Sequence, residues 1–288
     1  MVRLTSPTGT FVPSNPAMGL AEPDRRSYQK AMLNILRHGA PTDKPTLMIA
    51  HGLYGSARNW GAIAKRLCDD RQVIAVDMRN HGDSPWTDSH SYSDMAADLA
   101  EVIAAEGGPV DLIGHSMGGK ASMTLALQHP DLLRRLLVAD IAPVQYSHSQ
   151  IQFIHAMRGV DLNQVERRFD AEEQLARQGV EKALQSFFTQ SLDLPNKRWR
   201  LNLDTLERDM PLVMGFPDLT KAGSTPVFEG PTLFLSGANS DYVLAEHRPI
   251  IKAMFSQSHF AKLPDSGHWL HAENPRAFVA TARSFFDA

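Results

Sequence analysis

The chain of 288 residues contains a single cysteine, Cys68, so no disulfide can form within it. This is typical of a reducing compartment, and we expect a cytoplasmic protein. Long hydrophobic runs are also missing, because the longest, such as residues 46–50 and 136–139, are far too short to cross a bilayer. Prolines and polar residues interrupt the N-terminal segment where a signal peptide would be continuously apolar, which predicts a flexible extension over residues 1–25.

Neither sign of charge dominates the sequence. Lys and Arg number 29 against 32 Asp and Glu, which gives a formal net charge of −3. Such a balance provides no strong field for a nucleic acid or an anionic membrane surface, and we expect neither as a partner. The length suffices for one large domain with an inserted subdomain, and nothing in the composition fixes an oligomeric state.

Short apolar segments alternate with helical patterns along the chain. The expected strands are residues 46–50, 72–77, 110–115, 135–141, 231–237 and 259–264, and the expected helices are residues 59–68, 93–106, 117–129 and 275–286. Because these strands are apolar throughout, both of their faces are expected to be buried, as in a parallel sheet covered by helices. The predicted fold class is α/β, with a doubly wound and mostly parallel sheet.

The pattern changes between residues 144 and 227. Apolar residues recur there at helical spacing, with no clear buried strand before Pro231. This predicts a helical insertion between two late strands, above the carboxyl ends of the strands, where open α/β sheets bind ligands. We therefore expect an α/β core formed by residues 26–143 and 228–288, and a helical lid formed by residues 144–227.

The segment "GHSMG", residues 114–118, places Ser116 between an expected strand and an expected helix. A strand-to-helix turn this tight forces strained dihedral angles on its central residue, and the flanking glycines provide the space that a Cβ would occupy. The serine hydroxyl is then exposed near the positive end of the following helix, where a base can take its proton. We interpret Ser116 as a nucleophile.

A serine nucleophile that attacks a carbonyl needs two backbone N–H donors for the oxyanion, one of them from the following residue, Met117. We expect the other from Leu53, in the loop "AHGLYGS" after the first predicted buried strand, whose glycines let the chain fold back close to Ser116. In the same loop we interpret His51 as a residue that orients the backbone and Tyr54 as a wall of the pocket.

The base is expected after the final strand, in the chain order Ser, acid, His. The segment "LPDSGHWLHAENP" supplies His268, and Gly267 before it gives the backbone freedom to place the imidazole over the sheet edge. His271 suggests a metal pair with His268, but no cluster of carboxylates or cysteines supports one. We expect neither a metal nor a cofactor.

Two carboxylates compete to orient the base. Asp140 ends the strand that follows the helix of the nucleophile, and Asp241 lies in the turn after the next strand. An acid placed as G-x-x-D from Gly237 would stand at position 240, which is Ser240, and Asp241 is one residue late. In a tight turn one residue changes the direction of the side chain, so we favour Asp140 and keep Asp241 as the alternative.

Several segments together resemble one family, the α/β-hydrolase-fold serine esterases. They are "HGLYGSARNW", "VIAVDMRNHGDSPW", "DLIGHSMGGKASM", "LLVADIAPVQY", "WRLNLDTL", "PTLFLSGANSDYV" and "SGHWLHAENP". The resemblance is closest to the YbfF-type bacterial carboxylesterases and their abhydrolase-domain relatives in mitochondria, and it covers about residues 28–287. It implies the α/β-hydrolase fold and an acid at Asp140, while an aspartate at position 241 departs from the usual pattern.

The resemblance also implies a reaction, the hydrolysis of carboxylic esters, or of thioesters such as acyl-CoA, through an acyl-enzyme on Ser116 without a cofactor. Candidate pocket residues besides Tyr54 are His115, Phe153, Phe187, Trp199 and Trp269. Two other functions stay open, because a fold does not fix its chemistry. The same triad serves carbon–carbon bond hydrolysis or perhydrolysis, and a non-catalytic ligand receptor can retain this fold.

Overall fold

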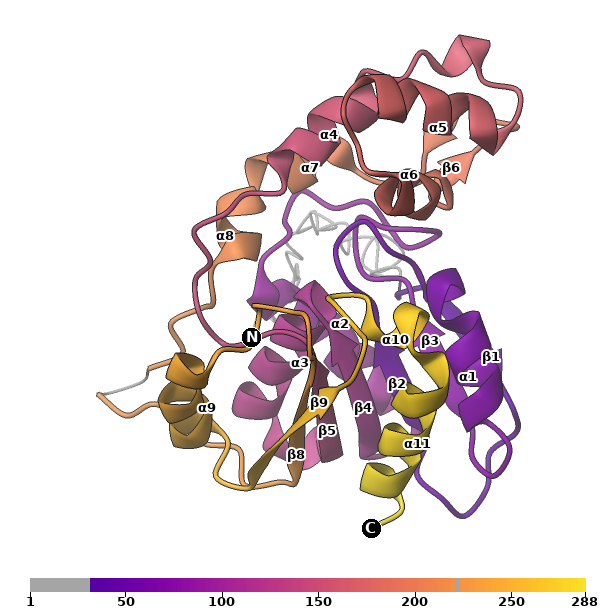
Figure 1. The fold of residues 1–288 in the computed structure, drawn as a ribbon. Helices are drawn as coiled ribbons and strands as arrows, with labels where there is room; N and C mark the ends of the chain where they lie inside the picture. The colour runs from indigo at the N-terminus through magenta and orange to yellow at the C-terminus, as the bar shows by residue number, and fades with distance from the viewer. Residues whose placement is uncertain (1–31, 221–222) are drawn as a thin grey trace, which may run out of the picture. The chain divides into compact units, whose positions relative to one another are not determined.

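The computed structural model describes residues 32–220 and 223–288, so the extension predicted for residues 1–25 lies outside the described residues. Within them, a seven-stranded sheet has the strand order β1-β3-β2-β4-β5-β8-β9 (Figure 1). The strands are β1 (Ile35–His38), β2 (Leu47–Ala50), β3 (Val73–Val76), β4 (Val110–His115), β5 (Leu133–Ala139), β8 (Thr232–Gly237) and β9 (Ser258–Leu263).

The pairing of the strands is parallel except between β1 and β3. The six predicted strands are all present, and the prediction of a mostly parallel sheet is confirmed. The antiparallel edge strand β1 was missed, because Ile35 and Leu36 are followed by Arg37 and His38 and the strand is only partly buried. Such a short segment lacks the continuous apolar run that marks the central strands.

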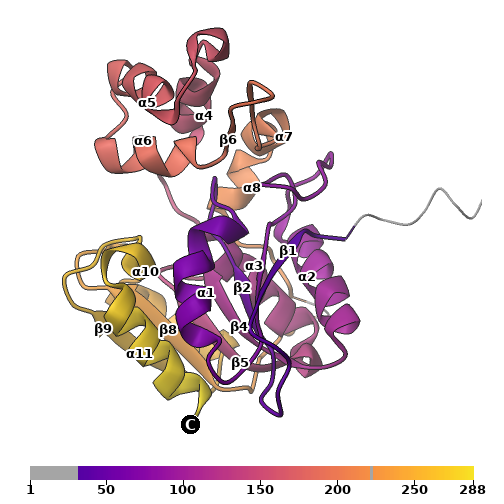
Figure 2. The same ribbon diagram turned by 90° about the vertical axis from the view of Figure 1, so that its right-hand side faces the viewer.

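Helices cover both faces of the sheet (Figure 2). The helices α1 (Gly61–Leu67) and α11 (Pro275–Phe286) pack on one face, where they meet Leu47 and Ile49 of β2. The helices α2 (Tyr92–Glu106), α3 (Met117–Gln128) and α9 (Arg248–Met254) pack on the other face, whose hydrophobic core includes Met48 and Ala50 of β2. Successive residues of β2 therefore enter two different cores, which explains why the strand is apolar throughout.

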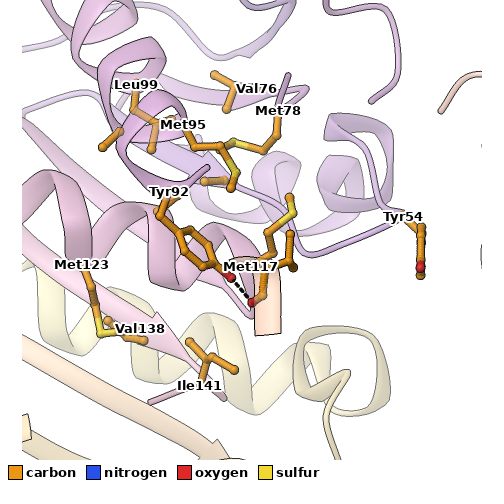
Figure 3. Close-up of a cluster of buried hydrophobic side chains, with 14 of the residues drawn as sticks. Tyr54, Val76, Met78, Tyr92, Met95, Leu99, Met117, Met123, Val138 and Ile141 are labelled. Carbon is orange, nitrogen blue, oxygen red and sulfur yellow. Dashed lines mark hydrogen bonds between the residues drawn. The ribbon is translucent and has the colours of Figure 1, made fainter. Parts of the chain in front are cut away.

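Figure 3 shows part of the second core, in which Tyr92, Met95 and Leu99 come from α2 and Met117 and Met123 from α3. The last helix of the chain begins as the sequence predicts. The Asn274 side chain accepts a hydrogen bond from the backbone N–H of Ala277, and a proline stands in the first turn of α11. These are the ordinary signals of a helix start.

The chain between β5 and β8 forms a mainly helical insertion, which lies beyond one end of the sheet in both views (Figures 1 and 2). Its elements are α4 (Ile151–Arg158), α5 (Arg168–Arg177), α6 (Lys182–Thr189), β6 (Leu192–Asp193), β7 (Arg198–Trp199), α7 (Leu203–Arg208) and α8 (Met210–Met214). The two-residue strands β6 and β7 pair with each other and not with the main sheet.

Backbone hydrogen bonds hold the insertion on the loop that follows β3. The N–H of Gly82 donates to the carbonyl of Arg200 over 2.8 Å, and the N–H of Asn202 donates to the carbonyl of Asn80 over 3.0 Å. The hydroxyl of Ser191 reaches the loop after β2 by donating to the carbonyl of Tyr54. The insertion is thereby fixed at the carboxyl end of the parallel strands, the edge where sheets of this kind bind ligands.

Candidate active site

Ser116 occupies the turn between β4 and α3 with φ of 51° and ψ of −118°, a strained conformation for a residue with a side chain. The flanking glycines make this turn possible. A Cβ at Gly114 would lie 2.4 Å from the Ser122 hydroxyl, and one at Gly118 would lie 2.3 Å from the carbonyl oxygen of Ala50. Both distances are far below van der Waals contact, so no larger residue fits at either position without a shift.

Ser116, His268 and Asp140 form a continuous chain of hydrogen bonds. The Ser116 hydroxyl lies 3.0 Å from His268 Nε2, and His268 Nδ1 lies 2.8 Å from Asp140 Oδ2. Since a carboxylate only accepts, Nδ1 carries the proton and Nε2 is free to accept one from the serine. Three segments far apart in the sequence meet at one sheet edge, after β4, β5 and β9.

Asp140 is fully buried, and its carboxylate has three donors. Oδ1 accepts the backbone N–H of Gly237 over 3.0 Å, and Oδ2 accepts the hydroxyl of Ser240 as well as the imidazole. Such a network fixes the direction of the carboxylate and compensates its burial. Asp241, the alternative acid, is exposed, and the structure does not bring it into the chain of hydrogen bonds with His268.

The two expected oxyanion donors have free backbone N–H groups. Met117 is the first residue of α3, where no carbonyl of the helix is available to its N–H. In the described part of the chain, neither this N–H nor that of Leu53 donates to a protein acceptor. Gly52 brings the loop after β2 against the nucleophile, because a Cβ at this glycine would lie 3.2 Å from the Cβ of Ser116.

His51 fixes the conformation of the same loop. Its Nδ1 donates to the carbonyl of Gly52 over 2.8 Å, and its Nε2 accepts the backbone N–H of Met78 over 2.9 Å. Burial lowers the pKa of His51 below its ordinary value, which keeps the ring neutral with one donor and one acceptor. This is the backbone-orienting role that we expected for His51.

His115, the residue before the nucleophile, is attached to the loop that carries His268. Its Nε2 donates to the backbone carbonyl of His268 over 2.9 Å. Burial, followed by the nearby rings of His271 and His268, holds the pKa of His115 well below its ordinary value. The neutral ring therefore keeps a single N–H for this bond at neutral pH.

A cavity of about 60 Å³ opens beside the Ser116 hydroxyl and is bounded by the core and the insertion. Four of the predicted pocket residues, Tyr54, His115, Phe187 and Trp269, line it, together with the two expected oxyanion donors. Other lining residues are Trp60, Tyr92, Lys120, Ile141, Tyr146, Leu184, Phe188, Val213, Met214 and Tyr242. Most of the wall is aromatic or aliphatic, so the cavity suits an uncharged group.

Two predicted pocket residues, Phe153 and Trp199, do not line this cavity, and for them the prediction was wrong. The indole N–H of Trp199 donates to the carbonyl of Met157 over 2.9 Å inside the insertion. The ring of Phe153 packs against Phe188, with 5.2 Å between the ring centroids. Both side chains belong to the core of the insertion, the ordinary use of apolar residues at helical spacing.

Two residues of the site, Tyr242 and Lys120, were not predicted from the sequence. The ring of Tyr242 stacks on the imidazole of His268, and Lys120 lines the cavity one helical turn after the nucleophile. Burial lowers the pKa of Lys120 to about 7, and three carbonyl oxygens around Nζ favour the protonated form. The signal for Lys120 was present, because it is the one charged residue in α3.

In the residues that the structure describes, no three His, Cys, Asp or Glu side chains gather as a metal site. Over the same residues, no helix combines the length and the apolar character needed to cross a membrane.

A parallel sheet with a serine in the turn after β4, and with an acid and a histidine after later strands, is the architecture of the α/β hydrolases. The model of the Alpha/beta hydrolase family matches residues 47–282, and the chain belongs to this family. It is 39% identical over 252 residues to the sn-1-specific diacylglycerol lipase ABHD11 of Mus musculus, covering 84% of this chain and 80% of that protein.

Two further relatives carry esterase names. Esterase YbfF of Escherichia coli is 34% identical over 247 residues, which cover 84% of this chain and 92% of the esterase. A solved structure described as a marine microorganism esterase superposes with a TM-score of 0.82 at 35% identity, covering 88% of this chain and 99% of that one. The resemblance inferred from the sequence is therefore confirmed at the level of family and fold.

Proposed function

We propose that this chain is a serine esterase that hydrolyses carboxylic esters through an acyl-enzyme on Ser116. The observation that carries the proposal is the hydrogen-bonded chain from Ser116 through His268 to Asp140, beside two free backbone N–H groups. The names of the relatives, two esterases and a lipase, point to the same class of bond.

In the first half of the reaction, His268 Nε2 takes the hydroxyl proton while Ser116 Oγ attacks the ester carbonyl carbon. The negative charge that develops on the carbonyl oxygen is stabilised by the N–H groups of Leu53 and Met117. The bond to the alcohol then breaks, and the alcohol leaves with the proton from His268. Asp140 stabilises the imidazolium and holds the ring in the tautomer that has Nε2 free.

In the second half, a water molecule attacks the acyl carbon and gives a proton to His268 Nε2. The tetrahedral intermediate collapses, Ser116 Oγ takes this proton back, and the carboxylic acid is released. A thioester such as acyl-CoA would follow the same steps, with a thiol in place of the alcohol.

The insertion, residues 144–227, acts in this proposal as a lid over the acyl group. Its residues Leu184, Phe187 and Phe188 provide one wall of the cavity, opposite the core. The cavity of about 60 Å³ is smaller than the roughly 150 Å³ of an apolar cavity that takes up benzene. A cavity of this size therefore favours short acyl groups, and a long acyl chain would require the lid to move.

Hydrolysis of nitrophenyl esters of increasing chain length tests the proposal. We expect turnover of the short esters, and a loss of at least about a thousandfold in kcat for Ser116→Ala. Ser284→Ala, on the exposed side of α11, is the matched control and should retain full activity. Turnover that survives Ser116→Ala would rule out the nucleophile, and a native protein that binds esters without turning them over would favour a receptor.

A further inference from the structure

Lys120 is a charged side chain at a fully buried position, with 1% of its surface exposed. It lies on α3 one turn after Ser116, and its backbone N–H donates to the carbonyl of Ser116 over 3.0 Å. A buried ammonium is costly unless each of its N–H groups finds an acceptor. The hydrogen-bond acceptors around Lys120 therefore indicate its role.

All three N–H donors of Lys120 are used on backbone carbonyls at the two ends of the insertion. Nζ lies 2.8 Å from the carbonyl oxygen of Val144, on the connection that leads into the insertion. It also lies 3.0 Å from that of Met214 and 2.6 Å from that of Gly215, on the connection that leads out. We call these two segments, residues 144–146 and 213–215, the lid neck.

Aromatic residues complete the surroundings of the ammonium. Nζ lies 4.7 Å from the centre of the Tyr146 ring, within range of a favourable cation–π interaction. The Tyr146 N–H donates to the Met214 carbonyl over 3.0 Å, and the Tyr92 hydroxyl donates to the Val213 carbonyl over 2.6 Å. Lys120 thus contacts both connections of the neck at once.

We propose that Lys120 is a positioning residue that clasps both ends of the lid and so sets the size of the acyl pocket above Ser116. Val213 and Met214 of the neck line the cavity, so a shift of the neck moves the pocket wall directly. Without the ammonium, the partly buried carbonyls of Val144, Met214 and Gly215 each lose a donor, and the neck would separate or admit water to satisfy them. This inference rests on the proposed function of the pocket as an acyl site.

The proposed clasp acts on substrate binding more than on the chemical step. The hydrogen bonds among Ser116, His268 and Asp140 come from the core alone, and no atom of the neck takes part in them. A variant without the clasp should therefore show a changed KM and a changed preference for acyl-chain length, with a smaller change in kcat.

The test compares Lys120→Met, which retains the apolar stem without donors, with Lys120→Gln, which retains two N–H donors. Lys252→Met, at an exposed position on α9, is the control. For Lys120→Met we expect KM for nitrophenyl acetate to rise about tenfold, with kcat changed by less than about threefold. The ratio of kcat/KM for the octanoate ester to that for the acetate ester should rise by about tenfold, because the pocket is no longer held closed.

Limited proteolysis gives a readout that does not depend on catalysis. Cleavage within residues 144–227 of Lys120→Met should be about tenfold faster than in the native protein, while the core fragments remain intact. Lys120→Gln should fall between the two, and Lys252→Met should match the native protein. Unchanged KM, chain-length ratio and cleavage rate in Lys120→Met would overturn the proposal, as would faster cleavage spread equally over core and lid.

Failure of this inference is distinguishable from failure of the proposed function. Labelling of Ser116 by a fluorophosphonate in the native protein reports on the nucleophile, while the proteolysis of the lid reports on the clasp. If neither Lys120 variant folds, hydrogen exchange of the native protein tests whether the lid neck is held in place. The amide of Tyr146 is then expected to exchange as slowly as amides of the core, and exchange at the rate of exposed loops contradicts the clasp.

Discussion

The phenol ring of Tyr242 lies flat against the imidazole of His268, with 4.0 Å between the ring centroids and 21° between the planes. Three residues of the connection after β5 hold Tyr242 in place. Its hydroxyl contacts His148 Nε2 and the Gln150 side chain, and its backbone carbonyl accepts the Tyr146 hydroxyl over 2.7 Å. The orientation of the proposed base is therefore linked to the start of the lid.

This stacking predicts a graded response at position 242. Tyr242→Leu removes the flat surface that limits rotation of the imidazole, and we expect kcat to fall about tenfold with little change in KM. Tyr242→Phe retains the ring and loses only the hydroxyl contacts, so its kcat should remain within about twofold of the native value. Steady-state kinetics with a short nitrophenyl ester measure both, and equal losses in the two variants would contradict a stacking role.

If Asp140 is the acid, substitutions of the two candidate aspartates should have very different effects on kcat. Asp140→Asn takes away the charge that stabilises the imidazolium and favours the wrong tautomer, so kcat should fall by about a thousandfold or more. Asp241→Asn changes an exposed side chain and should leave kcat within about twofold. Both variants are expected to fold, which circular dichroism can check. A larger loss in Asp241→Asn would reverse the assignment.

The close packing at Gly118 predicts a loss of stability for Gly118→Ala. The added Cβ would lie 2.3 Å from the Ala50 carbonyl and 2.5 Å from that of His51, so α3 and β2 must separate. We expect the free energy of unfolding to fall by about 2 kcal/mol or more. Gly61→Ala is the matched control, because nothing lies within 4 Å of its Cβ and its φ is −54°. That change should be neutral or stabilising by about 0.5 kcal/mol in urea denaturation.

Buried neutral histidines predict a loss of stability in acid. Burial lowers the pKa of His90 and of His271 to about 3, and it lowers the pKa of His51, His81 and His115 as well. In the unfolded chain these rings take up protons as the pH falls below about 6.5, whereas the folded state cannot. Stability is therefore complete above this pH and decreases toward pH 3, by about 1.4 kcal/mol per pH unit for each of His90 and His271.

Urea denaturation between pH 7 and pH 4.5 measures this slope. His271→Gln removes one of the buried rings and should reduce the uptake of protons on unfolding by about one. His129→Gln, at an exposed position after α3, should leave the slope unchanged. A free energy of unfolding that does not vary over this pH range would show that the buried rings are protonated in the folded state.

The strands and the nucleophile turn could be predicted because their causes are local. A run of apolar residues is sufficient to mark a strand buried on both faces, and the glycines around Ser116 provide the space that the tight turn needs. The direction of the acid side chain could not be predicted in the same way, because it depends on the backbone conformation at the strand end. Asp140 adopts φ of 53°, and Ser240, at the position where the alternative acid was considered, donates its hydroxyl to Asp140.

The missed residues act through contacts between distant parts of the chain. Lys120 meets the carbonyls of Val144 and Met214 across 24 and 94 residues, and no local pattern indicates such an encounter. Phe153 and Trp199 were predicted to line the pocket but lie in the core of the insertion. Helical spacing indicates that an apolar residue faces inward, and it does not distinguish the core of the insertion from the wall of the pocket. The tertiary packing of the insertion determines which of its apolar residues lie in its own core and which line the pocket.

The hydroxyl of Ser240 donates to the carboxylate of Asp140, so two neighbouring strand ends are joined beneath the catalytic site. Strands β5 and β8 are parallel neighbours, and residues just beyond their ends meet at one point under a single imidazole. Either strand end is thus a suitable position for the carboxylate, and the other strand end then carries a small neutral hydrogen-bond partner. Two substitutions that exchange the residues at positions 140 and 240 would thus keep a carboxylate and a hydroxyl beside each other, without moving the histidine or the serine.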